Sequence, residues 1–166
     1  ISAPTGYSTL VKDLLDGTSA KKLHKSYETA TFNGAAHLVN QIGGKDSHTR
    51  GNHSLLDRIN NTSDVLNQFA FDYGISLDGN SDNYTLRDQD VGNALDELSL
   101  LEKQLRNFDV SNKRLQRIKN AGRVKMARVD MLQKISTAKK NISQMYGAAV
   151  VEHDSKEQLV ADILKG

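Results

Sequence analysis

Apolar residues recur at spacings of three and four along most of this chain, which is the period of an amphipathic α-helix. The pattern predicts N-terminal helices within residues 7–74, a polar loop at 75–87, a long helical region at 88–147 and a last helix at 154–165. The alternation with a period of two that marks a half-buried strand is not part of this pattern. The sequence therefore predicts one all-α domain over residues 1–166, a bundle of about five or six helices.

The N-terminal part divides at glycines. A cluster of leucines and Val11 precedes Gly17, which predicts a short helix over 7–17 with a glycine stop. Residues 18–44 predict one amphipathic helix ended by Gly43 and Gly44, with inward positions Ala20, Leu23, Tyr27, Ala30, Gly34, Leu38 and Ile42. Residues 53–74 predict the next helix, and the poor helix formers at 60–63 predict a kink or local break within it.

The stretch 78–90, DGNSDNYTLRDQD, partly matches a calcium-binding loop. Asp78, Asn80 and Asp82 stand where the first three ligands of such a loop stand, but Asn83 replaces its glycine and Gln89 replaces its bidentate glutamate. The match is therefore incomplete. The residue types favour a polar loop built from Asx turns, and no metal ligand is assigned.

The region 88–147 allows two interpretations. Val91, Leu95, Leu98, Leu101, Leu105 and Phe108 define one apolar stripe, and a second begins after the residues NFDVSN at 107–112. The region is either one long helix or a helical hairpin, and we favour a break near 108–111. The last helix, at 154–165, has Asp154 as its N-cap and Glu157 as the capping-box partner.

Residues 113–146 form a helix with two apolar sides when placed at about 100° per residue. One side is a near-heptad seam suited to packing along another helix, made by Val124, Ala127, Met131, Ile135, Ala138, Ile142 and Met145. The second apolar set, roughly opposite, is Leu115, Ile118, Met126 and Val129, with Gly122 among them. Most of the cations lie on the flanks between. Such a helix is expected to be surrounded by neighbours in its own chain or in other copies.

Composition supports a helical domain. The 166 residues are enough for a hydrophobic core, and one proline with 5% aromatic residues disfavours a β-sandwich or barrel. The absence of cysteine excludes disulfides and thiolate chemistry. No apolar run approaches the roughly 18 residues of a transmembrane helix, and no secretory signal pattern is visible. Localisation stays open.

Charge is unevenly distributed. Residues 103–140 hold twelve of the 22 Lys and Arg residues but only Asp109 and Asp130 of the 20 acids, so this segment carries +10 and the remainder −8. Phosphate contacts would come from Arg114, Arg117, Arg123, Lys125, Arg128, Lys134, Lys139 and Lys140. The alternative is that these cations are solvated, or paired with acidic helices of the same chain or of other copies. No aromatic residue lies among them before Tyr146, which disfavours base stacking.

Catalytic motifs are missing from the sequence. The five histidines form no metal-ligand pair of the His-x3-His type, and the chain contains no nucleophile elbow, P-loop or dinucleotide fingerprint. We therefore expect neither an enzyme nor a cofactor, and we assign no catalytic residue.

Three functional hypotheses follow from these patterns. The first is a non-enzymatic helical assembly protein, such as a subunit of a virion, filament or secretion apparatus, that self-associates or packs on partner helices through residues 113–146 and also contacts nucleic acid. The second is a dedicated, sequence-independent nucleic-acid-binding protein that uses the same basic helix. The third is an exported effector or partner-binding helical module.

Overall fold

The protein is an all-α bundle in the part of the chain that its computed structural model describes, residues 6–27, 35–43, 51–108 and 119–147. This confirms the fold class expected from the sequence. Within these residues there are no strands, and the helices are α1 (Tyr7–Leu15), α2 (Ala20–Ser26), α3 (Ala35–Gly43), α4 (Leu55–Tyr73), α5 (Val91–Asn107) and α7 (Ala121–Tyr146), with 3₁₀ turns η1 (Ser81–Asn83) and η2 (Asp88–Asp90).

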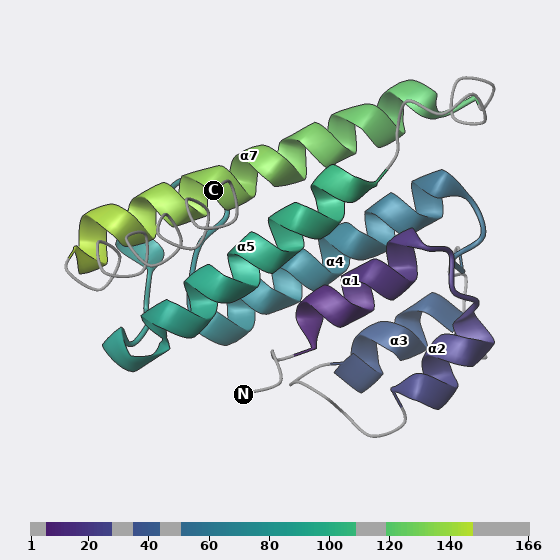
Figure 1. Cartoon of the computed structure of the whole chain (residues 1–166), viewed down its shortest axis with the longest axis horizontal. Helices are drawn as coiled ribbons and strands as arrows, with labels where there is room; N and C mark the ends of the chain where they lie inside the picture. Colours follow the sequence, from purple (N-terminus) through teal and green to yellow (C-terminus); the bar gives the residue numbers. More distant parts are fainter. Residues whose placement is uncertain (1–5, 28–34, 44–50, 109–118, 148–166) are drawn as a thin grey trace, which may run out of the picture.

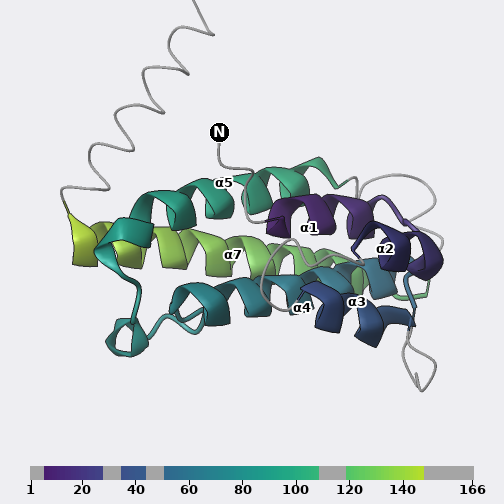
Figure 2. The ribbon, with the colours of Figure 1, turned by 90° about the horizontal axis from the view of Figure 1, so that it is seen from below.

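Helices α4 and α5 lie diagonally across the core of the bundle (Figure 1). Helix α1 packs against both of them from one side, and α7 packs against both from the other side. Figure 2 shows α7 between α5 and α4, and it packs against both. Helices α2 and α3 pair with each other at one end of the bundle. Helix α7 therefore has neighbours on only one side among these helices.

Helix α1 confirms the expected short helix with a glycine stop. It ends at Leu15, and Gly17 adopts a φ of 82°, which a side chain would strain. Asn52, only 1% exposed, fixes this end of α1: its amide donates to the carbonyl oxygens of Leu14 (3.1 Å) and Thr18 (3.0 Å). The other end is held by Glu97 of α5, which accepts from the backbone N–H of Ser8 (2.8 Å).

The single helix expected over residues 18–44 is wrong. Helix α2 ends at Ser26 and α3 begins at Ala35, and the two pack against each other. A continuous helix cannot bring residues 20–26 alongside residues 35–43, so both apolar stripes are satisfied by folding back. Tyr27, at the end of α2, is buried, and its hydroxyl donates to Asp13 of α1 (3.0 Å).

Of the kink or local break predicted at residues 60–63, the local break is wrong, because α4 is continuous from Leu55 to Tyr73. The polar side chains there are used by the fold. Thr62 donates to the carbonyl oxygen of Arg58 (2.8 Å), one turn back, and the Asn61 amide donates to Gly51 (2.8 Å) and Asn52 (3.0 Å). Hydrogen bonds made by these side chains, within α4 and to residues 51–52 before it, thus outweigh the low helix propensity of this stretch.

Residues 75–87 form the polar loop that the sequence predicts, and its turns are of the Asx type. The Asp78 carboxylate accepts from the hydroxyl of Ser76 and from the N–H of Asn80, and the Asn80 side chain accepts from the N–H of Asp82 (3.1 Å). The hydrogen bond from Ser76, with that from the Asn80 backbone, lowers the pKa of Asp78 below its ordinary value. Backbone and hydroxyl donors therefore occupy one oxygen of Asp78 and that of Asn80, two of the three residues that the sequence compared with calcium ligands.

Helices α5 and α7 form a hairpin, which decides between the two interpretations of residues 88–147. Helix α5 ends at Asn107, and Phe108 is extended (ψ 112°), in agreement with the expected break. Helix α7 then runs back along α5 (Figure 1). The helix predicted at 154–165 lies outside the described residues.

Candidate interaction surface on helix α7

One side of α7 is part of the hydrophobic core. The predicted packing seam is buried at Val124, Met131, Ile135, Ala138 and Ile142, while Met145, the last of its residues, is 44% exposed. The partners of this seam are α4 and α5 of the same chain. The seam that the sequence offered to another copy is therefore already occupied within the molecule.

The opposite side of α7 is exposed and partly apolar. Met126 is 75% exposed and Val129 is 49% exposed. Gly122 precedes Met126 by one helical turn, and a Cβ atom added to it would meet no atom within 4 Å. We call Gly122, Met126 and Val129, with the exposed Arg123 and Asp130 beside them, the outer face of α7. Leu115 and Ile118, the other members of the predicted second apolar set, lie outside the described residues.

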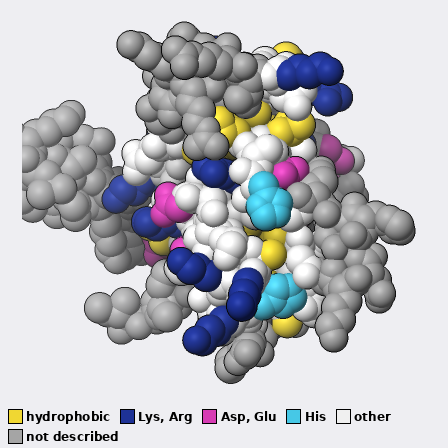
Figure 3. Space-filling model, turned by 90° about the vertical axis from the view of Figure 1, so that its right-hand side faces the viewer, with side chains coloured by type: hydrophobic (Ala, Val, Ile, Leu, Met, Phe, Trp, Pro, Cys, Tyr) yellow, Lys and Arg dark blue, Asp and Glu magenta, His cyan; other side chains and the backbone are white. Residues whose placement is uncertain are grey.

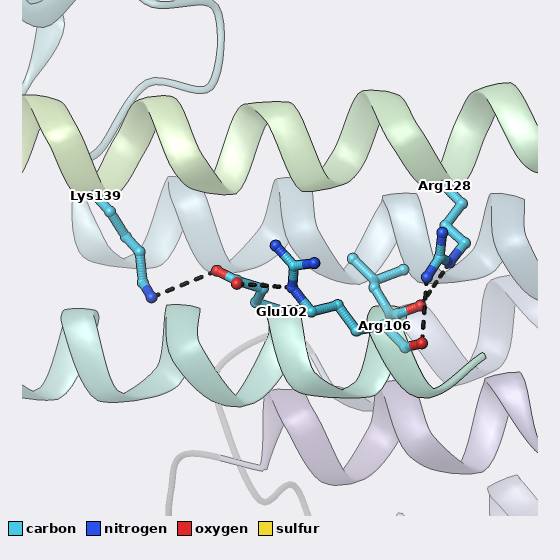
Figure 4. Close-up of polar contacts among 5 residues, drawn as sticks. Glu102, Arg106, Arg128 and Lys139 are labelled. Atoms are coloured by element: carbon cyan, nitrogen blue, oxygen red, sulfur yellow. Dashed lines mark hydrogen bonds and ion pairs between the residues drawn. The ribbon is translucent and has the colours of Figure 1, made fainter. Parts of the chain in front are cut away.

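Arg128 serves the fold. Its guanidinium donates from Nε to the carbonyl oxygen of Leu105 (2.7 Å) and from a terminal nitrogen to that of Arg106 (3.2 Å), as Figure 4 shows. These are carbonyl groups of the last turn of α5, where the helix leaves carbonyl oxygens with unused acceptor capacity; that of Leu105 also accepts from the N–H of Phe108 (3.3 Å). A cation at this end also interacts favourably with the helix dipole. Arg128 thus acts as a helix cap, and whether it also contacts phosphate stays a prediction.

Lys139 is paired across the hairpin. Its ammonium group lies 3.4 Å from one oxygen of Glu102, whose other oxygen accepts from Nε of Arg106 at 2.9 Å (Figure 4). Partial burial acts to raise the pKa of Glu102, but the hydrogen bond from Arg106 and the charges of Lys139 and Arg106 outweigh it and hold the pKa below its ordinary value. Glu102 therefore stays ionised and pairs with two cations of the basic segment, offsetting one of their two charges.

The remaining predicted phosphate contacts differ in their surroundings. Lys134 pairs with Asp130 one turn earlier (3.0 Å). Arg123, Lys125 and Lys140 are exposed and form no ion pair with any residue in the described ranges. Arg114 and Arg117 lie outside those ranges. Of the predicted phosphate contacts in the described ranges, Arg128, Lys134 and Lys139 thus bond to other groups of the protein. The other three are exposed and form no ion pair there.

Figure 3 shows the end of the bundle that lies to the right in Figure 1. Lys and Arg side chains are spread over this end, with Asp and Glu side chains and histidines among them. The described face thus carries both signs of charge, with cations in excess. A surface of this kind suits a partner of mixed charge at least as well as a purely anionic polymer.

Two residues of interest were absent from the predicted sites. Glu102 is the counterion of two cations, but its role required knowledge of the hairpin because it lies 37 residues from Lys139. Phe71 on α4 is 82% exposed, the most exposed large apolar side chain of the described residues. Its signal was available in the sequence, since Phe71 falls outside the three-and-four spacing of its helix.

The described residues lack two features, a metal-binding cluster and a membrane-spanning helix. Among the described residues, no group of three or more His, Cys, Asp or Glu side chains is arranged to hold a metal ion. None of the helices in the described ranges combines the length and hydropathy of a membrane span.

Comparisons of the chain with protein-family models, curated proteins and solved structures found no match. The class of the protein consequently rests on its own fold: an all-α bundle in which a 26-residue helix is buried along one side and exposed along the other.

Proposed function

We propose that this chain is a non-enzymatic helical assembly protein that associates with other copies of itself through the outer face of α7. The observation that carries the proposal is the exposure of Met126 on a helix whose opposite side is in the core. An isolated exposed apolar residue is ordinary, but Met126 and Val129 are adjacent on one side of a regular helix and have Gly122 beside them. A second helix can pack closely against such a surface.

Because the buried seam of α7 is already occupied within the molecule, its outer face is the side that a second copy can reach. Val124, Met131 and Ile135 are held by α4 and α5, so another copy has no access to them without unfolding the hairpin. The outer face requires no rearrangement to be reached by a second molecule. Assembly through α7 thus uses the second of the two apolar sides that the sequence describes.

The experiment measures mass against concentration by sedimentation velocity, from micromolar to near-millimolar protein. The proposal expects the average mass to rise with concentration and the Met126→Glu variant to stay monomeric, because burying a carboxylate in an apolar contact is unfavourable. Gln144→Glu is the matched control: it adds the same charge at an exposed position on the same side of α7, five turns away. A wild-type protein that stays monomeric throughout would contradict the proposal.

A second candidate function is sequence-independent binding of nucleic acid. The observation in its favour is that Arg123, Lys125 and Lys140 are exposed without an ion-pair partner among the described residues. Such cations bind phosphates with an affinity that falls steeply with salt.

This candidate predicts that DNA or RNA is retained at low salt and released at moderate salt. Changing Arg123, Lys125 and Lys140 together to Glu should abolish retention without loss of helicity. The same reversal at Lys21, Lys22 and Lys25, exposed on α2, is the control for net charge and should retain binding. Equal loss in both triple variants, or no retention at low salt, would end this hypothesis.

A further inference from the structure

The outer face of α7 has a pattern that is symmetric about Met126. Four residues before Met126 is Gly122, and three residues after it is Val129: a residue without a side chain and an exposed apolar one. Three residues before it is Arg123, and four residues after it is Asp130: a cation and an acid. The two members of each pair are seven residues apart, so they lie on the same flank of the helix.

An antiparallel pair of identical helices related by a twofold axis brings each flank against the same flank of the other helix, with its direction reversed. When the axis passes beside Met126, Arg123 of one copy lies opposite Asp130 of the other, and the converse pair forms by symmetry. On the other flank, Val129 of each copy lies opposite Gly122 of the other. Met126 of both copies meets at the axis.

We propose that α7 binds α7 of a second copy in this antiparallel, twofold arrangement centred beside Met126. The inference rests on the proposed function, since it assigns the partner and the geometry of the same surface. The complementarity of the two faces supports it, because in this arrangement Arg123 lies opposite Asp130 and Val129 lies opposite Gly122. A parallel pair would bring the Arg123 and Asp130 flank against the Gly122 and Val129 flank, leaving these charges without their opposites.

Local surroundings favour these contacts. The space beside Gly122 is open, so the Val129 side chain of a second copy can reach the helix backbone there. Asp130 is exposed and bonded to Lys134 (3.0 Å), and its carboxylate has further acceptor positions for the guanidinium of a second Arg123. Arg123 has no ion-pair partner in the described residues, so it is available for that contact.

The symmetry also limits the size and strength of the assembly. A twofold contact uses the same patch on both molecules, so this surface closes at a dimer. Because α7 begins at Ala121, the two helices would overlap from Ala121 to Met131, about 11 residues or roughly 16 Å. Lys134 lies beyond this overlap, and Asp130 already offsets its charge. The contact is shorter than a standard interface, so we expect a weak dimer that forms with increasing concentration.

Cross-linking tests the geometry because the chain has no cysteine. Met126→Cys in the full chain should form a disulfide-linked dimer under mild oxidation, since two Cβ atoms at the axis of an antiparallel helix pair come close enough for a disulfide. Lys140→Cys is the control: this residue is also exposed on α7, but the arrangement places it far from its own copy. We expect rapid cross-linking of the first variant and background cross-linking of the second. Self-cross-linking of Lys140→Cys at the same rate would overturn the antiparallel geometry.

Charge reversal gives a second readout, by sedimentation. Arg123→Asp and Asp130→Arg should each weaken dimerisation because like charges then face one another, and the double variant should restore it. Failure of the double variant to recover association overturns the proposed pairing. If the wild type associates but these variants have no effect, the geometry is wrong while self-association stands. A wild type that never associates removes both proposals.

Discussion

The guanidinium of Arg128 donates to the carbonyl oxygen of Leu105 across 2.7 Å and so caps the last turn of α5 from the neighbouring helix. This contact gives a structural role to Arg128, which lies in one of the most basic parts of the sequence. It also predicts which cations tolerate substitution, because a cation that donates to the carbonyl groups at a helix end differs from one that points into water.

The cap predicts a difference between two arginines of α7. Arg128→Ala should lower the free energy of unfolding by about 1–2 kcal/mol, because the carbonyl groups of Leu105 and Arg106 lose a charged donor. Arg123→Ala is the matched control, exposed on the same helix, and should change it by less than about 0.5 kcal/mol. Urea unfolding followed by circular dichroism measures both. Equal effects would mean that Arg128 contributes nothing as a cap.

Glu102 predicts a dependence of stability on pH. Its pKa in the folded protein is below the ordinary value of 4.5, so its contribution is fully present above pH 4.5 and is lost as pH falls through the lowered pKa. Glu102→Gln should therefore lower the free energy of unfolding at pH 7 and have less effect in acid. Unfolding curves at several pH values for both proteins check this. An effect of Glu102→Gln that is independent of pH would contradict it.

The two sides of α7 predict opposite results for apolar substitutions. Ile135→Ala should cost about 2–5 kcal/mol of stability, because Ile135 is fully buried where α7 packs against α4 and α5. Met126→Ala should leave the stability of the monomer nearly unchanged and weaken only association. Thermal unfolding at low concentration and sedimentation at high concentration separate these effects. Loss of association in Ile135→Ala without loss of stability would mean that the buried seam is the intermolecular contact.

Substitution of Asn52, a buried polar residue in a loop, should have a large effect on the free energy of unfolding. Asn52→Ala should lower the free energy of unfolding by about 2–3 kcal/mol, because the carbonyl groups of Leu14 and Thr18 lose their shared donor at the end of α1. It also removes the acceptor of the amide of Asn61. Asn67→Ala, exposed on α4, is the control and should be almost neutral. Similar values for both asparagines would show that the buried network is dispensable.

Sequence periodicity predicted the helical class, the glycine stop after α1 and the end of α5 near Phe108, because these depend on local spacing and local backbone preference. It failed at residues 60–63 and 18–44, where the outcome depends on partners distant in the chain. Asn61 is held by Gly51 and Asn52, and α2 folds against α3. The low helix propensity of residues 60–63 did not interrupt α4, since the hydrogen bonds of their side chains compensated for it.

By itself, the sequence determined that α7 has two apolar sides with cations between them, since the angular position of each residue follows from the period of the helix. Tertiary structure alone decided which side enters the core and which cations are neutralised. The reason is physical: Lys139 meets Glu102, and Arg128 meets Leu105, only after the hairpin brings α5 beside α7. Spacing along one helix carries no information about such a neighbour, and the fold left Met126 as the exposed centre of the remaining side.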